Sequence, residues 1–302
     1  MNRPKVSIVI VNWNGKHYLD ACLSSVLNQT YKNFEIIMVD NASIDGSVEY
    51  VQTKYPSIKI IQTSEDLGFA KGCNIGMRAS NADYVVALSN DTRVEPNWLG
   101  ELVKVAKTDE KIGICGSKLL LMDMRDIYNS AGFFIIWNAF IYDRAPGKKV
   151  GKYEKLEQVN GVCLASALLR KEMLDEIGLL DERFFFGHDD VDLCWRAKNA
   201  GWKAMYVPAS VCYHKMLGSG QKLDYRFVVD AVWVISKNSN LLGLAGIAIY
   251  YFVAMMKAIV WKAFGKDKDY KPFFNALRAI PCEWKKGKPY REAREKNSKM
   301  FG

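Results

Sequence analysis

The sequence predicts an α/β fold in which a mostly parallel central sheet is flanked by helices. Continuous apolar runs alternate with amphipathic stretches through the first half of the 302-residue chain, as in a parallel sheet covered by helices. Polar side chains follow several of the predicted strands, where sheets of this kind bind their ligands. Hydrophobic residues make up 49% of the chain and charged residues 25%, so the chain can bury a large core and is not disordered.

The predicted elements follow one another regularly from the N-terminus. The run "VSIVIV" at 6–11 is β-branched and predicts a strand, and apolar residues at helical spacing over 17–29 predict a helix. Pro96 fits the first turn of a later helix that opens at "EPNWL". The intervening elements are strands at 34–40, 58–63 and 84–91 and helices near 46–55 and 71–79.

Three predicted strands end on carboxylate or amide side chains. These are Asn12 and Asn14 after the first strand, Asp40 and Asn41 after the second, and Asn90 and Asp91 after the fourth. Because parallel strands bring their carboxyl ends to one edge, we expect these groups to converge in a ligand site. The alternative is that Asp and Asn only start turns and cap helices.

A glycine-bearing segment, "EDLGFAKGCNIGMR" at 65–78, follows the third strand. Such a loop could hold phosphates, with glycines at 68, 72 and 76, positive charge from Lys71 and Arg78, and the amide of Asn74. Glycines at this spacing could equally permit tight helix packing. The first turn, "NWNGKHY", lacks the GxGxxG pattern, so a dinucleotide cofactor of the hydride-transfer type is not expected.

A second polar cluster lies in "FFFGHDDVDLCWR" at 184–196. Three carboxylates within four residues repel one another and are costly to bury, so they form either a solvated helix start or a functional site. Asp192 and Arg196 are four residues apart, which predicts an ion pair within one helix. His188 precedes the cluster and could contact a substrate or cap the helix.

Five segments resemble, in order and spacing, the motifs of family 2 glycosyltransferases of GT-A fold, above all the rhamnosyltransferase-like branch. They are "VSIVIVNWNG", "IIMVDNASIDGS", "DLGFAKGCNIG", "VALSNDTRVEPNWL" and "FFFGHDDVDLCWRAKNAGWKAMYVPASVCYH", together spanning about residues 5–220. The resemblance implies a GT-A catalytic domain over 1–222, with a Rossmann-like sheet. It also implies inverting transfer of a sugar from a nucleotide-diphosphate sugar to a hydroxyl of a lipid-linked or cell-surface glycan.

By the same resemblance, the family's metal-binding DxD motif falls on Ser89, Asn90 and Asp91. Asp91 matches the second aspartate, and His214 matches a further ligand after the last core strand, which implies Mg²⁺ or Mn²⁺ as cofactor. Ser89 stands at the position of the first aspartate, so this chain lacks one carboxylate of the motif. Asp190 matches the catalytic base, with Asp189 standing where a glutamate is more usual.

The resemblance also implies a donor-binding set and supporting residues. A UDP-, dTDP- or GDP-linked sugar would contact residues of the strand ends and glycine segment: Val11, Asn12, Asn14, Asp40, Asn41, Gly68, Lys71, Asn74, Asn90 and Asp91. His188, Asp189, Asp192 and Arg196 would support the base or face the acceptor. The sugar itself is not identified.

The region 223–302 differs in character from the catalytic part. Residues 240–261 are almost wholly apolar, and from Lys257 onward 13 Lys or Arg stand against 5 Asp or Glu, a net +8 of the chain's +9. We expect a membrane-surface anchor that faces anionic lipid. The alternatives are a single transmembrane helix near 241–261, or a helix packed on the catalytic domain or on a second copy of the chain. The absence of a nucleic-acid-binding motif argues against nucleic acid as a partner.

The sequence also predicts the cellular compartment, and it bears on two alternative functions. The seven cysteines form no CxxC pair and the start of the chain lacks a signal-peptide pattern, so we expect a cytoplasmic enzyme, peripheral at the inner face of the membrane. A sugar-1-phosphate nucleotidyltransferase would need a glycine-rich basic loop directly after the first strand, which is missing. A catalytically inactive nucleotide-sugar-binding scaffold remains the alternative, because of Ser89.

Overall fold

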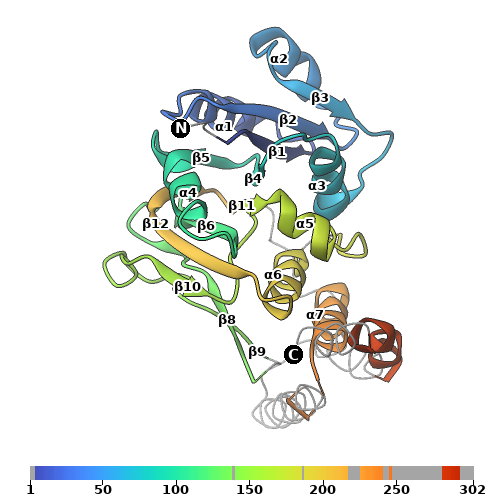
Figure 1. The fold of residues 1–302 in the computed structure, drawn as a ribbon. Helices are drawn as coiled ribbons and strands as arrows, with labels where there is room; N and C mark the ends of the chain where they lie inside the picture. Colours follow the sequence, from blue (N-terminus) through green and yellow to red (C-terminus); the bar gives the residue numbers. More distant parts are fainter. Residues whose placement is uncertain are drawn as a thin grey trace, which may run out of the picture. The chain divides into compact units, whose positions relative to one another are not determined.

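The computed structural model describes residues 4–137, 140–185, 187–216, 225–240, 245–246 and 281–292. The chain divides into two compact units, one of residues 1–134 and 143–217, the other of residues 135–142 and 218–302. The predicted mixed α/β fold with a mostly parallel central sheet is confirmed in the first unit (Figure 1).

The first unit is built on one sheet with the strand order β10-β12-β6-β11-β4-β1-β2-β3. Parallel pairing joins β1 to β2 and β4, β2 to β3, and β6 to β12, whereas β11 runs antiparallel between β4 and β6. β5 pairs with β12, and β7 with β6. The strands are β1 (Val6–Asn12), β2 (Phe34–Asp40), β3 (Lys59–Gln62), β4 (Tyr84–Ser89), β5 (Thr92–Val94), β6 (Ile112–Leu121), β7 (Tyr128–Ser130), β10 (Glu157–Val159), β11 (Ser166–Arg170) and β12 (Lys203–His214).

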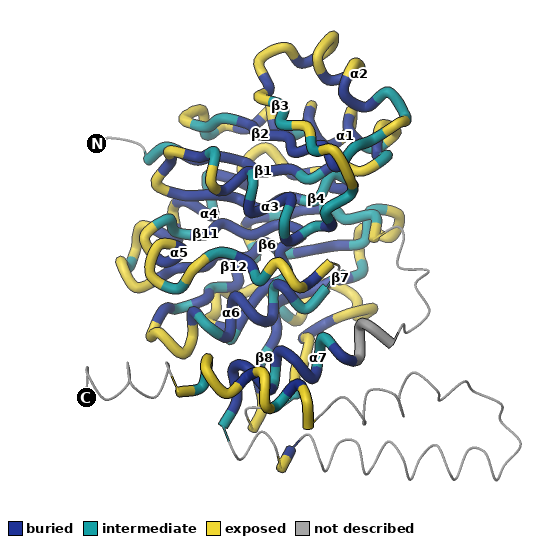
Figure 2. Tube along the Cα trace, turned by 90° about the vertical axis from the view of Figure 1, so that its right-hand side faces the viewer, coloured by how far each residue is buried: buried dark blue, intermediate teal, exposed yellow. Residues whose placement is uncertain are grey.

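Six helices accompany this sheet in the described part of the first unit. They are α1 (Lys16–Leu27), α2 (Ser47–Lys54), α3 (Gly68–Arg78), α4 (Trp98–Ala106), α5 (Lys171–Ile177) and α6 (Asp189–Asn199). The central strands β1 and β4 are buried on both faces and carry continuous β-branched and apolar runs, whereas α2 exposes much of its surface (Figure 2). The register pairs Asn12 with Asp40 and Val11 with Ser89, so the carboxyl ends of β1, β2 and β4 are level.

The described part of the second unit contains α7 (Tyr225–Asn238) and a helical stretch over 281–292. Residues 135–142 of the β8 (Phe133–Ile136) and β9 (Phe140–Asp143) hairpin also belong to it. No helix of the described residues is both long and apolar enough to span a bilayer. Most of the apolar segment 240–261, on which the anchor and transmembrane predictions rest, lies outside the described residues.

Three predicted boundaries were wrong. β4 ends at Ser89, and Asn90 and Asp91 form the turn into β5. Pro96 precedes α4, which starts at Trp98, because the backbone of Glu95–Asn97 makes a turn in which the Trp98 amide donates to the Glu95 carbonyl.

The third error concerns the glycine segment. α3 begins at Gly68, where the Asp66 carboxylate accepts a hydrogen bond from the Gly68 amide, so most of this segment is helix rather than loop. A Cβ at Gly72 would lie 2.8 Å from a Val11 methyl, and one at Gly76 would lie 2.3 Å from a Val9 methyl. The glycines therefore allow α3 to pack closely on β1, which was the alternative interpretation of their spacing.

Candidate active site

The predicted convergence of strand ends is present as a hydrogen-bonded network. The Asn12 amide, at the end of β1, donates to the Asp40 carboxylate of β2 at 2.8 Å and accepts from the Asn90 amide at 2.8 Å. The Ser43 amide donates to the other oxygen of Asp40 at 2.9 Å. A Cβ at Gly15 would lie only 2.2 Å from the Asn90 amide nitrogen, so glycine is needed for this approach. Asn12 thereby fixes side chains from three strands against one another.

Asn14 extends the network at its open side. Its backbone amide donates to the Ser43 hydroxyl, and its side-chain oxygen accepts from the Ile44 amide, both at 2.9 Å. Ser43 also lines an open surface pocket of about 540 Å³, together with Lys16, Ile44 and Tyr50. Polar groups at the strand edge therefore lie beside a cavity that a ligand can enter.

Asn41 contributes an unusual buried acceptor. Its side chain is 1% exposed, and its amide nitrogen donates to the Gly68 carbonyl at 3.0 Å and to the Asp66 carboxylate at 3.3 Å. These two acceptors fix the orientation of the amide, and among the described residues its oxygen accepts no hydrogen bond. An orphaned buried carbonyl oxygen is costly, so this position favours a ligand that brings an N–H or O–H group.

The turn after β4 directs two neighbouring side chains to different partners. Asn90 bonds to the strand-end network, whereas Asp91 Oδ1 lies 3.2 Å from His214 Nε2 at the end of β12. The antiparallel pairing of β5 with β12 aligns this pair, since Thr92 faces His214 and the Lys215 amide donates to the Asp91 carbonyl. The two residues predicted as metal ligands are thus brought together, directly next to the predicted donor site.

The Asp91–His214 pair fits a divalent cation in its chemistry. A carboxylate oxygen and an imidazole nitrogen are ordinary ligands for Mn²⁺, and the carboxylate also suits Mg²⁺. No group of three His, Cys, Asp or Glu side chains with metal-binding geometry occurs in the part of the chain that the structure describes. Of the described residues, Asp91 and His214 could supply ligands, and substrate oxygens and water could complete the coordination.

The acid cluster opens α6. Asp189 is 5% exposed and Asp190 is partly buried, and the Val191 amide donates to Asp190 Oδ1 at 2.8 Å. Burial, and after it the charge of Asp190, raises the pKa of Asp189, and burial together with the nearby Asp143 raises the pKa of Asp190. Asp190 is the more exposed of the two, and its proton affinity is raised as well.

His188 occupies the N-cap position of α6, with a left-handed backbone (φ 64°). Its side chain makes no capping hydrogen bond, so the predicted capping role is not observed. Burial lowers the pKa of His188 to about 4, and its imidazole is therefore neutral at physiological pH.

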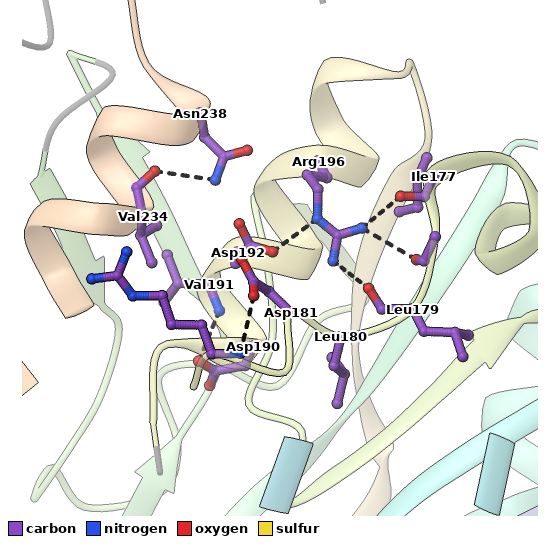
Figure 3. A network of polar contacts seen from close by, with 12 residues as sticks. Ile177, Leu179, Leu180, Asp181, Asp190, Val191, Asp192, Arg196, Val234 and Asn238 are labelled. Carbon is purple, nitrogen blue, oxygen red and sulfur yellow. Dashed lines mark hydrogen bonds and ion pairs between the residues drawn. The ribbon is translucent and has the colours of Figure 1, made fainter. Parts of the chain in front are cut away.

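The predicted ion pair between Asp192 and Arg196 is confirmed. Arg196 Nε lies 2.8 Å from Asp192 Oδ2, and the Asp192 side chain is fully buried. The guanidinium also donates to the carbonyl of Ile177, the last residue of α5, and to those of Gly178 and Leu179 just after it, at 2.7, 3.2 and 2.7 Å (Figure 3). Arg196 therefore joins α6, and with it the acid cluster, to the end of α5.

The side-chain amide of Asn74 makes hydrogen bonds within the fold. Its amide is 1% exposed and bonds to both backbone groups of Leu180 and to Glu182, at 2.9–3.0 Å. Arg78 pairs with the same Glu182 at 2.9 Å, and the hydrogen bond from Asn74, followed by Arg78 and then by the charge of Lys71, lowers the pKa of Glu182. Asn74 therefore holds α3 to the segment that precedes the acid cluster, and its role in donor binding stays a prediction.

Sequence reasoning missed Asn129, Ser43 and Glu182. Asn129 Oδ1 lies 2.8 Å from His214 Nδ1, on the ring edge opposite Asp91. Ser43 stands inside the quoted motif "IIMVDNASIDGS" and could have been found there. Asn129 and Glu182 have no local signal, because their contacts are with residues 85 and 108 positions away.

A mostly parallel sheet with polar groups converging at its carboxyl edge, and a carboxylate–imidazole pair beside them, is the arrangement of an α/β enzyme that binds its ligand at the strand ends. The model of the family "Glycosyl transferase family 2" matches residues 7–178. The chain belongs to this family and is a glycosyltransferase.

Two similar proteins named as glycosyltransferases support membership of this family. The chain is 27% identical over 242 residues to the N-acetylglucosaminyl-diphospho-decaprenol L-rhamnosyltransferase of Mycobacterium tuberculosis, covering 71% of this chain and 77% of the relative. It is 24% identical over 245 residues to glycosyltransferase AglE of Haloferax volcanii, covering 78% and 76%. The predicted rhamnosyltransferase-like character is confirmed at the level of this similarity.

Solved structures share the fold. GalNAc-T7, solved with UDP, GalNAc and Mn²⁺, matches with a TM-score of 0.65 at 19% identity, over 78% of this chain and 48% of that chain. This chain thus spans about half the length of GalNAc-T7. The mannosyltransferase PcManGT of Pyrobaculum calidifontis, solved with GDP-Man and Mn²⁺, matches with a TM-score of 0.56 at 16% identity, over 100% and 77%.

Proposed function

We propose that the protein is an inverting glycosyltransferase that moves a sugar from a nucleotide diphosphate to a hydroxyl of a lipid-linked or cell-surface glycan. The observation that carries this proposal is the turn after β4, where Asn90 joins the strand-end network and Asp91 pairs with His214 at 3.2 Å. A nucleotide bound at the network would present its diphosphate to that pair.

The strand-end residues would bind the donor. Asp40 and the orphaned oxygen of Asn41 are buried acceptors, which suits a base or ribose that donates hydrogen bonds. The walls of the donor-binding site would be completed by Val11, Asn14, Gly68 and Lys71. The nucleotide would be UDP, dTDP or GDP. Asn12 orients Asp40 and Asn90 toward the ligand.

Asp91 and His214 would hold Mg²⁺ or Mn²⁺, which would neutralise the charge that develops on the diphosphate leaving group. Asp190 would accept the proton of the attacking hydroxyl, helped by the raised pKa that burial gives it. Asp189, whose pKa is raised by burial and by the charge of Asp190, would be protonated beside it and would reduce the repulsion within the pair. Asp192 and Arg196 would hold the start of α6 in position.

The proposed acceptor and location rest on a similar protein and on the composition of the C-terminal region. The relative in M. tuberculosis is named for a decaprenol-linked acceptor, and the basic, apolar region 223–302 suits an anionic membrane surface. We place the enzyme in the cytoplasm, peripheral at the inner face of the membrane. Association of two copies through the C-terminal region belongs to the same proposal.

A thermal-shift panel tests the donor and metal assignments together. The full chain is mixed with UDP, dTDP, GDP and their sugars, each with Mn²⁺, Mg²⁺ or chelator, because a ligand that binds the folded state raises Tm. We expect one nucleotide family to raise Tm in a metal-dependent way, and Asp91→Ala and His214→Ala to lose only the metal-dependent part. A donor that binds equally well in chelator would refute the metal role, and no shift with any donor would favour a non-catalytic scaffold.

A further inference from the structure

Asn129 reaches the candidate metal pair from an irregular strand. β6 pairs with β12 on one side and with β7 on the other. Leu120 faces Tyr128 and Leu119 faces Ser130, so Asn129 is the additional residue of a β-bulge in β7. Bulges turn a side chain away from its regular direction and are frequent beside active sites. Here the bulge contains Asn129, whose side-chain amide lies 2.8 Å from the imidazole of His214.

The hydrogen bonds of Asn129 determine which imidazole nitrogen carries the proton. Asn129 Nδ2 donates toward the sulfur of Met216 at 3.2 Å, and Asn129 Oδ1 therefore faces His214 Nδ1, at 2.8 Å. An amide oxygen only accepts hydrogen bonds, so Nδ1 must carry the hydrogen. In the neutral ring, Nε2 then has a lone pair, and this atom lies 3.2 Å from Asp91 Oδ1.

Two acceptors at this separation repel each other unless a positive charge lies on or between them. We propose that Asn129 is a positioning residue, which fixes His214 in the Nδ1–H tautomer so that Nε2 can bind a divalent cation shared with Asp91. This inference rests on the proposed function, because it concerns the metal of that same site. Partners on the far nitrogen of a metal-binding histidine commonly change metal affinity by about 10–100-fold.

Nitrogen NMR of the imidazole rings tests the tautomer without any metal. The chain has three histidines, so ¹⁵N-histidine labelling of the full-length protein gives three ring systems, and the one missing from His214→Gln is His214. The spectra are recorded at about pH 8.5, well above the ordinary imidazole pKa of about 6.5. We expect the Nδ1–H form of His214 in the wild type and a shift toward Nε2–H in Asn129→Leu.

Metal binding is measured on the same variants by electron paramagnetic resonance of Mn²⁺, alone and with UDP, dTDP or GDP. We expect Asn129→Leu to bind Mn²⁺ about 10–100-fold more weakly than the wild type, and Asn129→Asp, which keeps an acceptor at Nδ1, to restore binding. Ser130→Ala changes the neighbouring residue of β7, whose hydroxyl donates to Asp143 rather than to His214, so it is the matched control and should leave tautomer and affinity unchanged.

The outcomes distinguish a failure of the proposed role of Asn129 from a failure of the proposed metal site. An Nε2–H tautomer in the wild type, or unchanged Mn²⁺ affinity in Asn129→Leu, overturns the role of Asn129 while the metal site stands. No Mn²⁺ binding by the wild type under any of these conditions overturns the metal site itself, and the positioning role with it.

Discussion

Removal of Arg196 should destabilise the protein far more than removal of Arg78, although both arginines make ion pairs of nearly equal length. Arg196 lies 2.8 Å from Asp192, and these side chains are 16% and 0% exposed. Arg78 lies 2.9 Å from Glu182, and these side chains are 60% and 40% exposed. Arg196→Leu removes the arginine partner of a buried carboxylate, at a cost of about 3–5 kcal/mol. Arg78→Leu breaks an exposed pair worth about 0–1 kcal/mol.

The assay is urea unfolding of the wild type and of both variants, followed by tryptophan fluorescence, with the free energy of unfolding compared at constant slope. A third variant, Arg196→Leu with Asp192→Leu, removes both charges and should recover part of the loss, because two apolar side chains leave no buried charge. Equal destabilisation by Arg196→Leu and Arg78→Leu would refute the reasoning from burial. No recovery in the double variant would assign the loss to the uncapped carbonyls after α5 instead.

Three further predictions address helix packing and the acid cluster. Gly76→Ala should destabilise by about 1–3 kcal/mol in urea unfolding, because its Cβ would meet a Val9 methyl at 2.3 Å. Gly100→Ala, also in a helix but with its nearest neighbour at 4.0 Å, should be neutral or stabilising, and equal effects would contradict the packing argument. Asp190 must be ionised to accept a proton, and burial raises its pKa above the ordinary aspartate value of about 4. The rate of sugar transfer should therefore fall as the pH is lowered through that raised value. A rate that falls only at or below pH 4 would count against Asp190 as the base. Asp189→Asn should stabilise the protein at pH 8 and have little effect at pH 4. Folding raises the pKa of Asp189, so the stability of the wild type falls as the pH rises through the folded-state pKa, and asparagine avoids this loss. Equal urea midpoints for variant and wild type at pH 8 would refute this.

The sequence predicted the strand-end half of the site well. Apolar runs determine which segments become parallel strands, and parallel register then brings Asn12, Asp40 and Asn90 to one edge. The contact between Asp91 and His214 was expected from resemblance to the family rather than from any spacing in the chain. The ion pair between Asp192 and Arg196 was predictable because both lie on one helix.

The remaining features depend on packing between distant segments. Gly72 and Gly76 are required by the methyl groups of β1, which no pattern within the glycine segment reveals. The side-chain amide of Asn74 donates to Leu180 and Glu182, which are 106 and 108 positions away, so the local sequence gives no sign of these contacts. The bulge that positions Asn129 lies in a strand of three residues, too short to give a periodic signal.

The measurement that tests the central claim most directly is sugar transfer by the wild type and Asp190→Asn with the donor found in the thermal-shift panel. The acceptor is a polyprenyl-diphosphate-linked sugar in anionic vesicles, and NMR gives the anomeric configuration of the product. We predict an inverted configuration for the wild type, and loss of transfer in Asp190→Asn with nucleotide affinity unchanged. A retained configuration, or wild-type turnover by Asp190→Asn, would contradict the account.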